Sequence, residues 1–157
     1  MKAAPSRDAI RVVLLGEPRG KERPRSRIAR TKSGKQYIAV YTPRETQKYE
    51  EALKLAGRAA MKRRDPLTGP LRVVVTAVMP VPKSWSGKRR EAALHGFERP
   101  TVAPDWDNIG KCLDALNGIV WQDDKQIVSA TVEKVYGQLP RIEIEVTPIT
   151  TAGLFST

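Results

Sequence analysis

The residues best suited to chemistry form a short acidic stretch within a basic chain. Asp105 and Asp107 are separated by one residue, Lys111 follows four residues after Asp107, and Asp123 and Asp124 come after the next turn. Carboxylates placed close together raise one another's pKa unless a cation lies between them. Mg²⁺ prefers oxygen ligands, and one or two carboxylates with substrate phosphate oxygens commonly bind it. The pattern therefore indicates a divalent-metal site.

In this interpretation Asp105, Asp107 and Asp124 are the metal ligands, and Asp123 is a neighbour or a replacement for Asp124. Lys111 lies one helical turn after Asp107, where an ammonium group can stabilise charge that develops on a phosphate. Each residue also has a structural interpretation: a helix cap, an i,i+4 ion pair, or a polar turn. Both interpretations stay open on the sequence alone.

The charge balance indicates the kind of partner. The chain has 157 residues, with 28 Lys and Arg against 17 Asp and Glu, which gives a formal net charge of +11. Such an excess favours a phosphate-rich partner. A basic surface around a carboxylate metal site predicts an enzyme that hydrolyses a polyanion.

The cysteine count and the apolar pattern indicate the cellular compartment of the protein. Cys112 is the only cysteine, so an intrachain disulfide is excluded and a zinc site built on thiolates is not expected. The N-terminal residues lack the apolar segment of a signal peptide, and no apolar run is long enough to span a bilayer. We therefore expect a cytoplasmic protein with no membrane partner.

A basic stretch between residues 16 and 43 is the expected nucleic-acid surface. Residues 26–30 and 36–41 flank the sequence Lys32-Ser33-Gly34-Lys35, which predicts a hairpin with an exposed basic tip. The predicted nucleic-acid contacts are Lys21, Arg23, Arg25, Arg27, Arg30, Lys32 and Lys35.

Helix signals occur in three segments. Thr42 as N-cap, Pro43 at the first helical position and Glu45 in a capping box predict a helix that runs to about Arg64. A short helix is expected over residues 87–94. Another is expected over 107–116, with Ile109, Cys112, Leu113 and Leu116 on one face.

Strand signals occur in four further segments. Residues 9–15 read as a first strand. Residues 71–79 are apolar on both faces, as is typical of the middle of a sheet. The alternating patterns of residues 128–133 and 141–146, separated by a turn, predict a terminal hairpin.

A family resemblance extends over about residues 10–147. The run Pro104-Asp105-Trp106-Asp107-Asn108, then Lys111, Leu113 to Gly118, and Trp121 to Val128 closely resembles the RusA-like Holliday junction resolvases, which prophages often encode. A less specific similarity covers Gly16-Glu17-Pro18, Lys21 to Arg25, and Tyr41-Thr42-Pro43.

The resemblance implies a fold, a site and a reaction. Its implied site has Asp105, Asp107 and Asp124 binding Mg²⁺ or Mn²⁺, with Lys111 as the catalytic lysine. The implied protein is a homodimer that cuts four-way DNA junctions by paired nicks, and its role in DNA recombination, DNA repair or phage DNA packaging stays open. A twofold dimer suits this role because it places two identical sites on two opposed strands. Ala103 departs from the family, since relatives often carry a basic residue there.

With the element pattern, the resemblance predicts one α+β domain over residues 1–157, with its core at about 9–149. Its expected architecture is a mixed, largely antiparallel sheet packed with two main helices. Two other functions remain open: a catalytically silent nucleic-acid-binding module, and a nuclease that acts on flaps or RNA.

Overall fold

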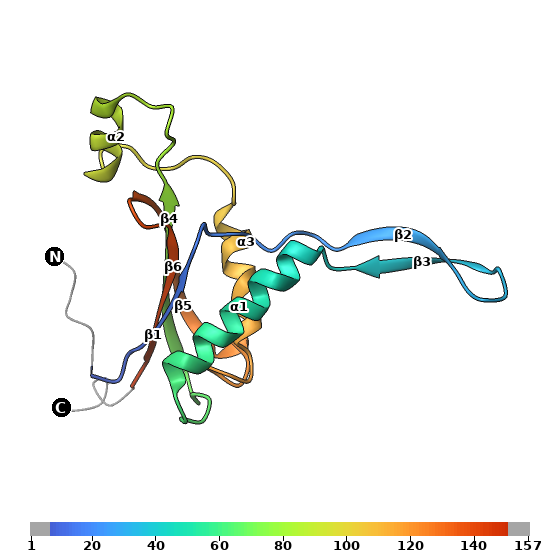
Figure 1. Cartoon of the computed structure of the whole chain (residues 1–157). Helices are drawn as coiled ribbons and strands as arrows, with labels where there is room; N and C mark the ends of the chain where they lie inside the picture. The colour runs from blue at the N-terminus through green and yellow to red at the C-terminus, as the bar shows by residue number, and fades with distance from the viewer. Residues whose placement is uncertain (1–6, 151–157) are drawn as a thin grey trace.

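A four-stranded mixed sheet forms the centre of the computed structural model, which describes residues 7–150 (Figure 1). The strand order is β1 (Ile10–Leu15), β6 (Arg141–Pro148), β4 (Leu71–Pro80) and β5 (Ile127–Gly137). β4 and β5 are parallel, whereas β1–β6 and β4–β6 are antiparallel. The predicted mixed, largely antiparallel sheet is therefore confirmed. The predicted central position of β4 is also confirmed.

The predicted terminal hairpin is wrong. β5 and β6 follow one another in the chain, but β4 lies between them and pairs with both. Residues 138–140 make the connection, and three extended residues span about 10 Å, which is two inter-strand spacings. Gly137 permits this crossing, because a Cβ at that position would collide with Val78 Cγ1 of β4. An alternating pattern records which face of a strand is buried, but not which strand lies beside it.

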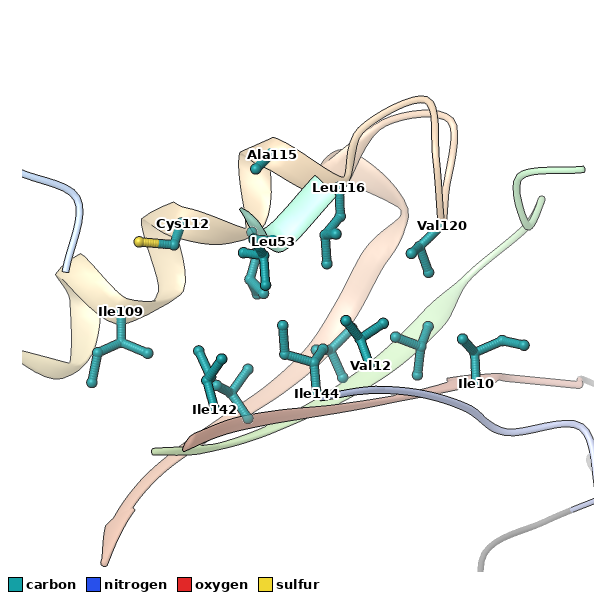
Figure 2. Close-up of a cluster of buried hydrophobic side chains, with 14 of the residues drawn as sticks. Ile10, Val12, Leu53, Ile109, Cys112, Ala115, Leu116, Val120, Ile142 and Ile144 are labelled. Atoms are coloured by element: carbon teal, nitrogen blue, oxygen red, sulfur yellow. The ribbon is translucent and has the colours of Figure 1, made fainter. Parts of the chain in front are cut away.

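Two helical segments cover one face of the sheet and enclose the core (Figure 2). They are α1 (Arg44–Met61) and α3 (Trp106–Lys111), which continues as the 3₁₀ helix η1 (Cys112–Leu116). The predicted apolar face of the second segment is confirmed, since all four of its residues are buried. Sheet residues such as Val12 and Ile144 face these helices across the core. The helix that carries Asp107 and Lys111 is therefore anchored along its length.

The predicted capping box of α1 does not form. The helix starts at Arg44 with Pro43 as its N-cap, and no side chain caps it. The Gln47 amide instead donates to the Thr42 carbonyl oxygen at 3.0 Å. The helix also ends at Met61, earlier than expected, where Lys62 takes a φ of 56°. The short helix α2 (Gly87–Leu94) has the predicted bounds, and the Ser86 hydroxyl caps it.

A two-stranded arm projects from the body of the molecule (Figure 1). Its strands are β2 (Arg25–Arg30) and β3 (Gln36–Tyr41), so the predicted basic hairpin is confirmed. The register puts Arg25, Arg27, Tyr37 and Tyr41 on one face, with the Arg27 guanidinium 5.5 Å from the centre of the Tyr41 ring. The other face carries Ile28, Ile38 and Val40, each more than 70% exposed.

Within residues 7–150, no helix combines the length and the apolar character that crossing a bilayer requires.

Candidate active site

The start of α3 carries the first predicted site residues. Asp105 is the N-cap residue, but its carboxylate makes no capping hydrogen bond. Asp107 lies in the first turn, and its Oδ2 is 3.3 Å from Lys111 Nζ. The same ammonium lies 3.4 Å from Asn108 Oδ1. The helix thus brings Asp107 and Lys111 together, as their spacing predicted, and leaves the Asp105 carboxylate free of capping.

This pair faces solvent. The side chains of Asp107 and Lys111 are 47% and 57% exposed, so a large substrate can reach them without opening the fold. An ion pair this exposed contributes about 0–1 kcal/mol to stability. Stability alone therefore gives little reason to place these two residues here.

The turn after Trp121 distinguishes Asp123 from Asp124. The Asp123 carboxylate accepts a hydrogen bond from the Lys125 backbone N–H at 2.9 Å, at the start of η2 (Asp124–Gln126). This bond holds the pKa of Asp123 below its usual value. Gln126 completes a capping box by accepting from the Asp123 N–H at 3.0 Å. Asp123 is thus occupied in shaping the turn, whereas Asp124 has no such role.

Asp124 instead lies beside Asp114, a residue that the sequence interpretation did not select. A hydrogen bond with the Asp114 side chain, with a smaller effect from burial, raises the pKa of Asp124. The signal for Asp114 was its spacing, because residues 107, 111 and 114 lie along one side of a helix. Asp114 joins Asp124 to the helix that carries Asp107.

The fit of this site to a metal can be judged from its donors. Across the described residues 7–150, no three His, Cys, Asp or Glu side chains gather closely enough to hold a metal ion. Asp105, Asp107 and Asp124 are therefore not collected into one cluster. Their carboxylate oxygens are nevertheless the donors that Mg²⁺ and Mn²⁺ prefer. The contact between Asp114 and Asp124 places two acidic groups where a nearby cation would be stabilised.

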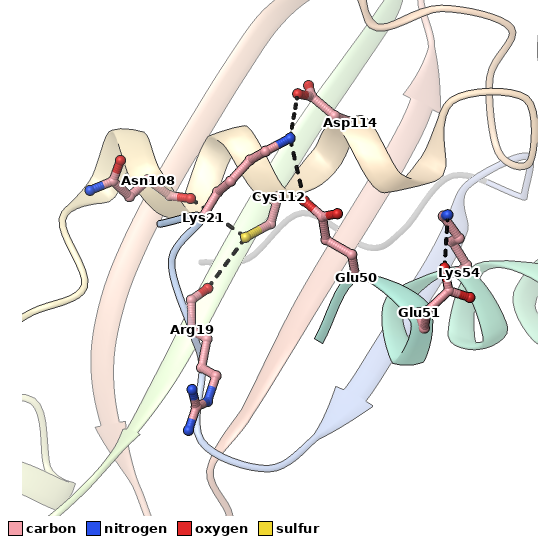
Figure 3. A network of polar contacts seen from close by, with 8 residues as sticks. All are labelled: Arg19, Lys21, Glu50, Glu51, Lys54, Asn108, Cys112 and Asp114. Carbon is pink, nitrogen blue, oxygen red and sulfur yellow. Dashed lines mark hydrogen bonds and ion pairs between the residues drawn. The ribbon is translucent and has the colours of Figure 1, made fainter. Parts of the chain in front are cut away.

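Lys21 pairs with carboxylates of α1 and η1 (Figure 3), unlike the other predicted DNA contacts. Its Nζ lies 3.3 Å from both Glu50 Oε1 on α1 and Asp114 Oδ2 on η1. Burial opposes the charged form, but the two carboxylates outweigh it and raise the pKa of Lys21. The other predicted contacts are exposed on the arm or just before it: Arg23, Arg25, Arg27, Arg30, Lys32 and Lys35.

A pocket of about 350 Å³ opens beside Asp105. Its lining includes Arg19, Gly20 and, from the start of α1, Thr46. The Thr46 hydroxyl is buried and has no hydrogen-bond partner among the described residues. Arg19 and Thr46 thus share this pocket with Asp105.

Comparison with known proteins identifies the class. Residues 16–147 match the family described as Endodeoxyribonuclease RusA, and the chain belongs to that family. It is also 36% identical, over 141 residues, to the uncharacterized protein YqaN of Bacillus subtilis (strain 168). That match covers 87% of this chain and 94% of YqaN. The predicted family is therefore confirmed, and the matched region includes the arm, α3 and the Asp123–Asp124 turn.

Proposed function

We propose that this protein is a divalent-metal-dependent, structure-selective endodeoxyribonuclease that resolves four-way DNA junctions by paired phosphodiester hydrolysis in the cytoplasm. The observation that carries the proposal is the exposed Asp107–Lys111 pair, 3.3 Å apart, on a helix fixed to the core of a RusA-family chain. Asp105 and Asp124 supply the other carboxylates.

Each side chain has a role in the proposed reaction. Asp105, Asp107 and Asp124, which are not gathered into one cluster, would have to come together to hold Mg²⁺ or Mn²⁺, and the ion would supply an activated water and a polarised phosphodiester. Lys111 donates to the phosphate or to the leaving 3′ oxygen and stabilises the charge that develops there. Asp107 holds the Lys111 ammonium in place until substrate arrives. Asp123 keeps Asp124 in position by fixing the turn.

The arm supplies the proposed DNA contacts. Arg25 and Arg27 share a face with Tyr37 and Tyr41, and such a face combines phosphate neutralisation with base stacking. These contacts position branched DNA without reading its sequence. A homodimer would present two such arms and two sites to the opposed strands of a junction.

A cleavage assay tests the proposal. Synthetic four-way junction is incubated with wild type, with Asp107→Asn, and with Asp65→Asn, a control at an exposed position beyond α1. Wild type and Asp65→Asn should nick the junction with Mg²⁺ or Mn²⁺ but not with EDTA. Asp107→Asn should lose at least a hundredfold in rate, because it loses a metal ligand, while it still binds the junction.

Two outcomes of this cleavage assay would contradict the proposal. Unchanged cleavage by Asp107→Asn would remove Asp107 from the site, and binding without cleavage by wild type would favour a silent binding module. Comparison of junction, flap, duplex and RNA substrates tests structure selectivity. Light scattering at several concentrations tests the dimer, and a monomer that remains a monomer on junction DNA would contradict paired nicking.

A further inference from the structure

We infer that Lys21 is a positioning residue of the active site, which fixes the helix of the catalytic residues to α1, and is not a contact to DNA. The inference rests on the proposed nuclease function, because it assigns Lys21 a part in that site. It differs from the sequence-based expectation, in which Lys21 was one of seven basic residues that bind phosphate.

The Lys21 ammonium joins two elements that carry acidic groups (Figure 3). It lies 3.3 Å from Glu50 Oε1 of α1 and 3.3 Å from Asp114 Oδ2 of η1, and its side chain is 31% exposed. Glu50 Oε1 is buried, although the Glu50 side chain as a whole is 20% exposed, and the nearby Lys21 ammonium compensates its charge. A partly buried carboxylate without such a partner is unfavourable. A DNA phosphate that drew Lys21 away would leave Glu50 in that state.

The backbone around Lys21 is fixed to the same helix. The Lys21 N–H donates to the Asn108 carbonyl oxygen at 2.9 Å. The Cys112 Sγ lies 3.5 Å from the carbonyl oxygens of both Arg19 and Asn108. The Lys21 backbone thus contacts α3 between Asp107 and Lys111, and the Arg19 backbone contacts Cys112, the first residue of η1.

Gly20 shows how closely the two segments approach. A Cβ at this position would lie 2.8 Å from Asn108 Cβ and 2.9 Å from Pro104 Cβ, distances that real Cβ atoms do not tolerate. Glycine is therefore required by the close approach of residues 19–21 to the start of α3. A shift of this segment toward α3 would push against Pro104 and Asn108, which lie on either side of Asp105 in the sequence.

Asp114 extends the effect of Lys21 to the remaining carboxylate. Lys21 Nζ pairs with the Asp114 carboxylate at 3.3 Å, and a hydrogen bond with the Asp114 side chain is the main cause that raises the pKa of Asp124. Residues 22–24 then connect Lys21 to β2, the first strand of the arm. Lys21 thus lies where the DNA-binding arm, α1 and the acidic residues of the site converge.

The test compares junction affinity with the rate of junction cleavage in a set of variants. Lys21→Met removes the ammonium, and Lys54→Met is the matched control, because Lys54 forms an exposed pair with Glu51 at 3.1 Å on α1. Lys32→Ala at the arm tip is the reference for loss of a phosphate contact. Junction affinity is measured at several salt concentrations without divalent ion, and cleavage is measured in single turnover with Mg²⁺ at saturating protein.

Lys21→Met should cleave at least tenfold more slowly in single turnover, while the salt dependence of its binding stays that of wild type. Lys54→Met should match wild type in both measurements. Lys32→Ala should reduce the slope of log K against log salt by about 0.9, the value for one phosphate contact on duplex DNA. Lys21→Arg should recover much of the cleavage rate, because it restores a cation between Glu50 and Asp114.

A double variant and a hydrogen-exchange measurement test the role of Lys21 if the single variant fails to fold or the cleavage rates are ambiguous. If Lys21→Met does not fold, Lys21→Met combined with Glu50→Gln removes the buried charge and should fold, yet still cleave slowly. Hydrogen exchange of the α3 and η1 amides should accelerate in the Lys21 variant and not in the Lys54 control. A lowered salt slope with an unchanged single-turnover rate and unchanged exchange would overturn the inference. Absence of cleavage by wild type would instead overturn the proposed function, and the exchange measurement would still decide the role of Lys21.

Discussion

Replacing Trp121 with phenylalanine should weaken the turn that carries Asp124. The Trp121 side chain is fully buried, and its indole N–H donates to Asn117 Oδ1 at 2.6 Å. Phenylalanine lacks the pyrrole part of the indole, whose buried surface is worth about 1 kcal/mol. The space left behind costs roughly a further 1 kcal/mol. The lost hydrogen bond adds about 1 kcal/mol, because water can reach only the exposed Asn117.

The expected total is therefore about 3 kcal/mol, which for a chain of this size lowers Tm by roughly 6–12 °C. Thermal unfolding followed by circular dichroism measures the change. Trp106→Phe is the matched control, because the Trp106 side chain is 67% exposed and should change Tm by little. Equal Tm values for the two variants would refute the reasoning that Trp121 anchors the turn.

Three further predictions follow from single contacts. Gly57→Ala should lower Tm although alanine favours helix, because the new Cβ would lie 2.8 Å from Leu116 Cδ2 in the core. Urea unfolding should show a free energy of unfolding about 1 kcal/mol lower than that of wild type. A higher free energy of unfolding would contradict the packing argument. Glu143→Gln should destabilise the protein at neutral pH. Burial acts against the charged form of Glu143, but two arginines outweigh burial and lower the pKa of Glu143. The stabilisation is therefore present above the ordinary pKa near 4.5 and is lost as pH falls through the lowered value. The free energies of unfolding of wild type and variant should converge between pH 7 and pH 3, and a constant difference would contradict this origin. Asp124→Asn should raise the Tm of metal-free protein slightly, because it removes repulsion with Asp114. The variant should also lose junction cleavage and show a smaller Tm gain than wild type when Mg²⁺ is added. An equal Tm gain in wild type and variant would remove Asp124 from the metal site.

Local signals in the sequence predicted local structure well. The hairpin of the arm was predicted from its turn residues, which act within a few residues of the chain, and the short helix expected over residues 87–94 has the observed bounds of α2. The central place of β4 was predicted from its two apolar faces, a pattern typical of a strand in the middle of a sheet. The pairing of Asp107 with Lys111 followed from helical spacing alone.

Contacts between distant segments were not predictable in the same way. The neighbour of β5 is β4 and not β6, and the alternating pattern is identical for either arrangement. The contact of Asp124 with Asp114 and the pairing of Lys21 with Glu50 depend on how separate elements pack. A count of basic residues could not distinguish Lys21, which pairs with two carboxylates, from an exposed lysine such as Lys32.

The aliphatic face of the arm has a consequence for the thermodynamics of binding. A two-stranded ribbon that packs against no other element is only marginally stable in water, and Ile28, Ile38 and Val40 gain nothing from burial while they stay exposed. A ligand that touches the arm must therefore provide the free energy that orders it, and this cost reduces the affinity gained from contacts with the arm. Heat capacity change on binding should consequently grow with the length of the DNA branches until they cover the arm, and then stop growing.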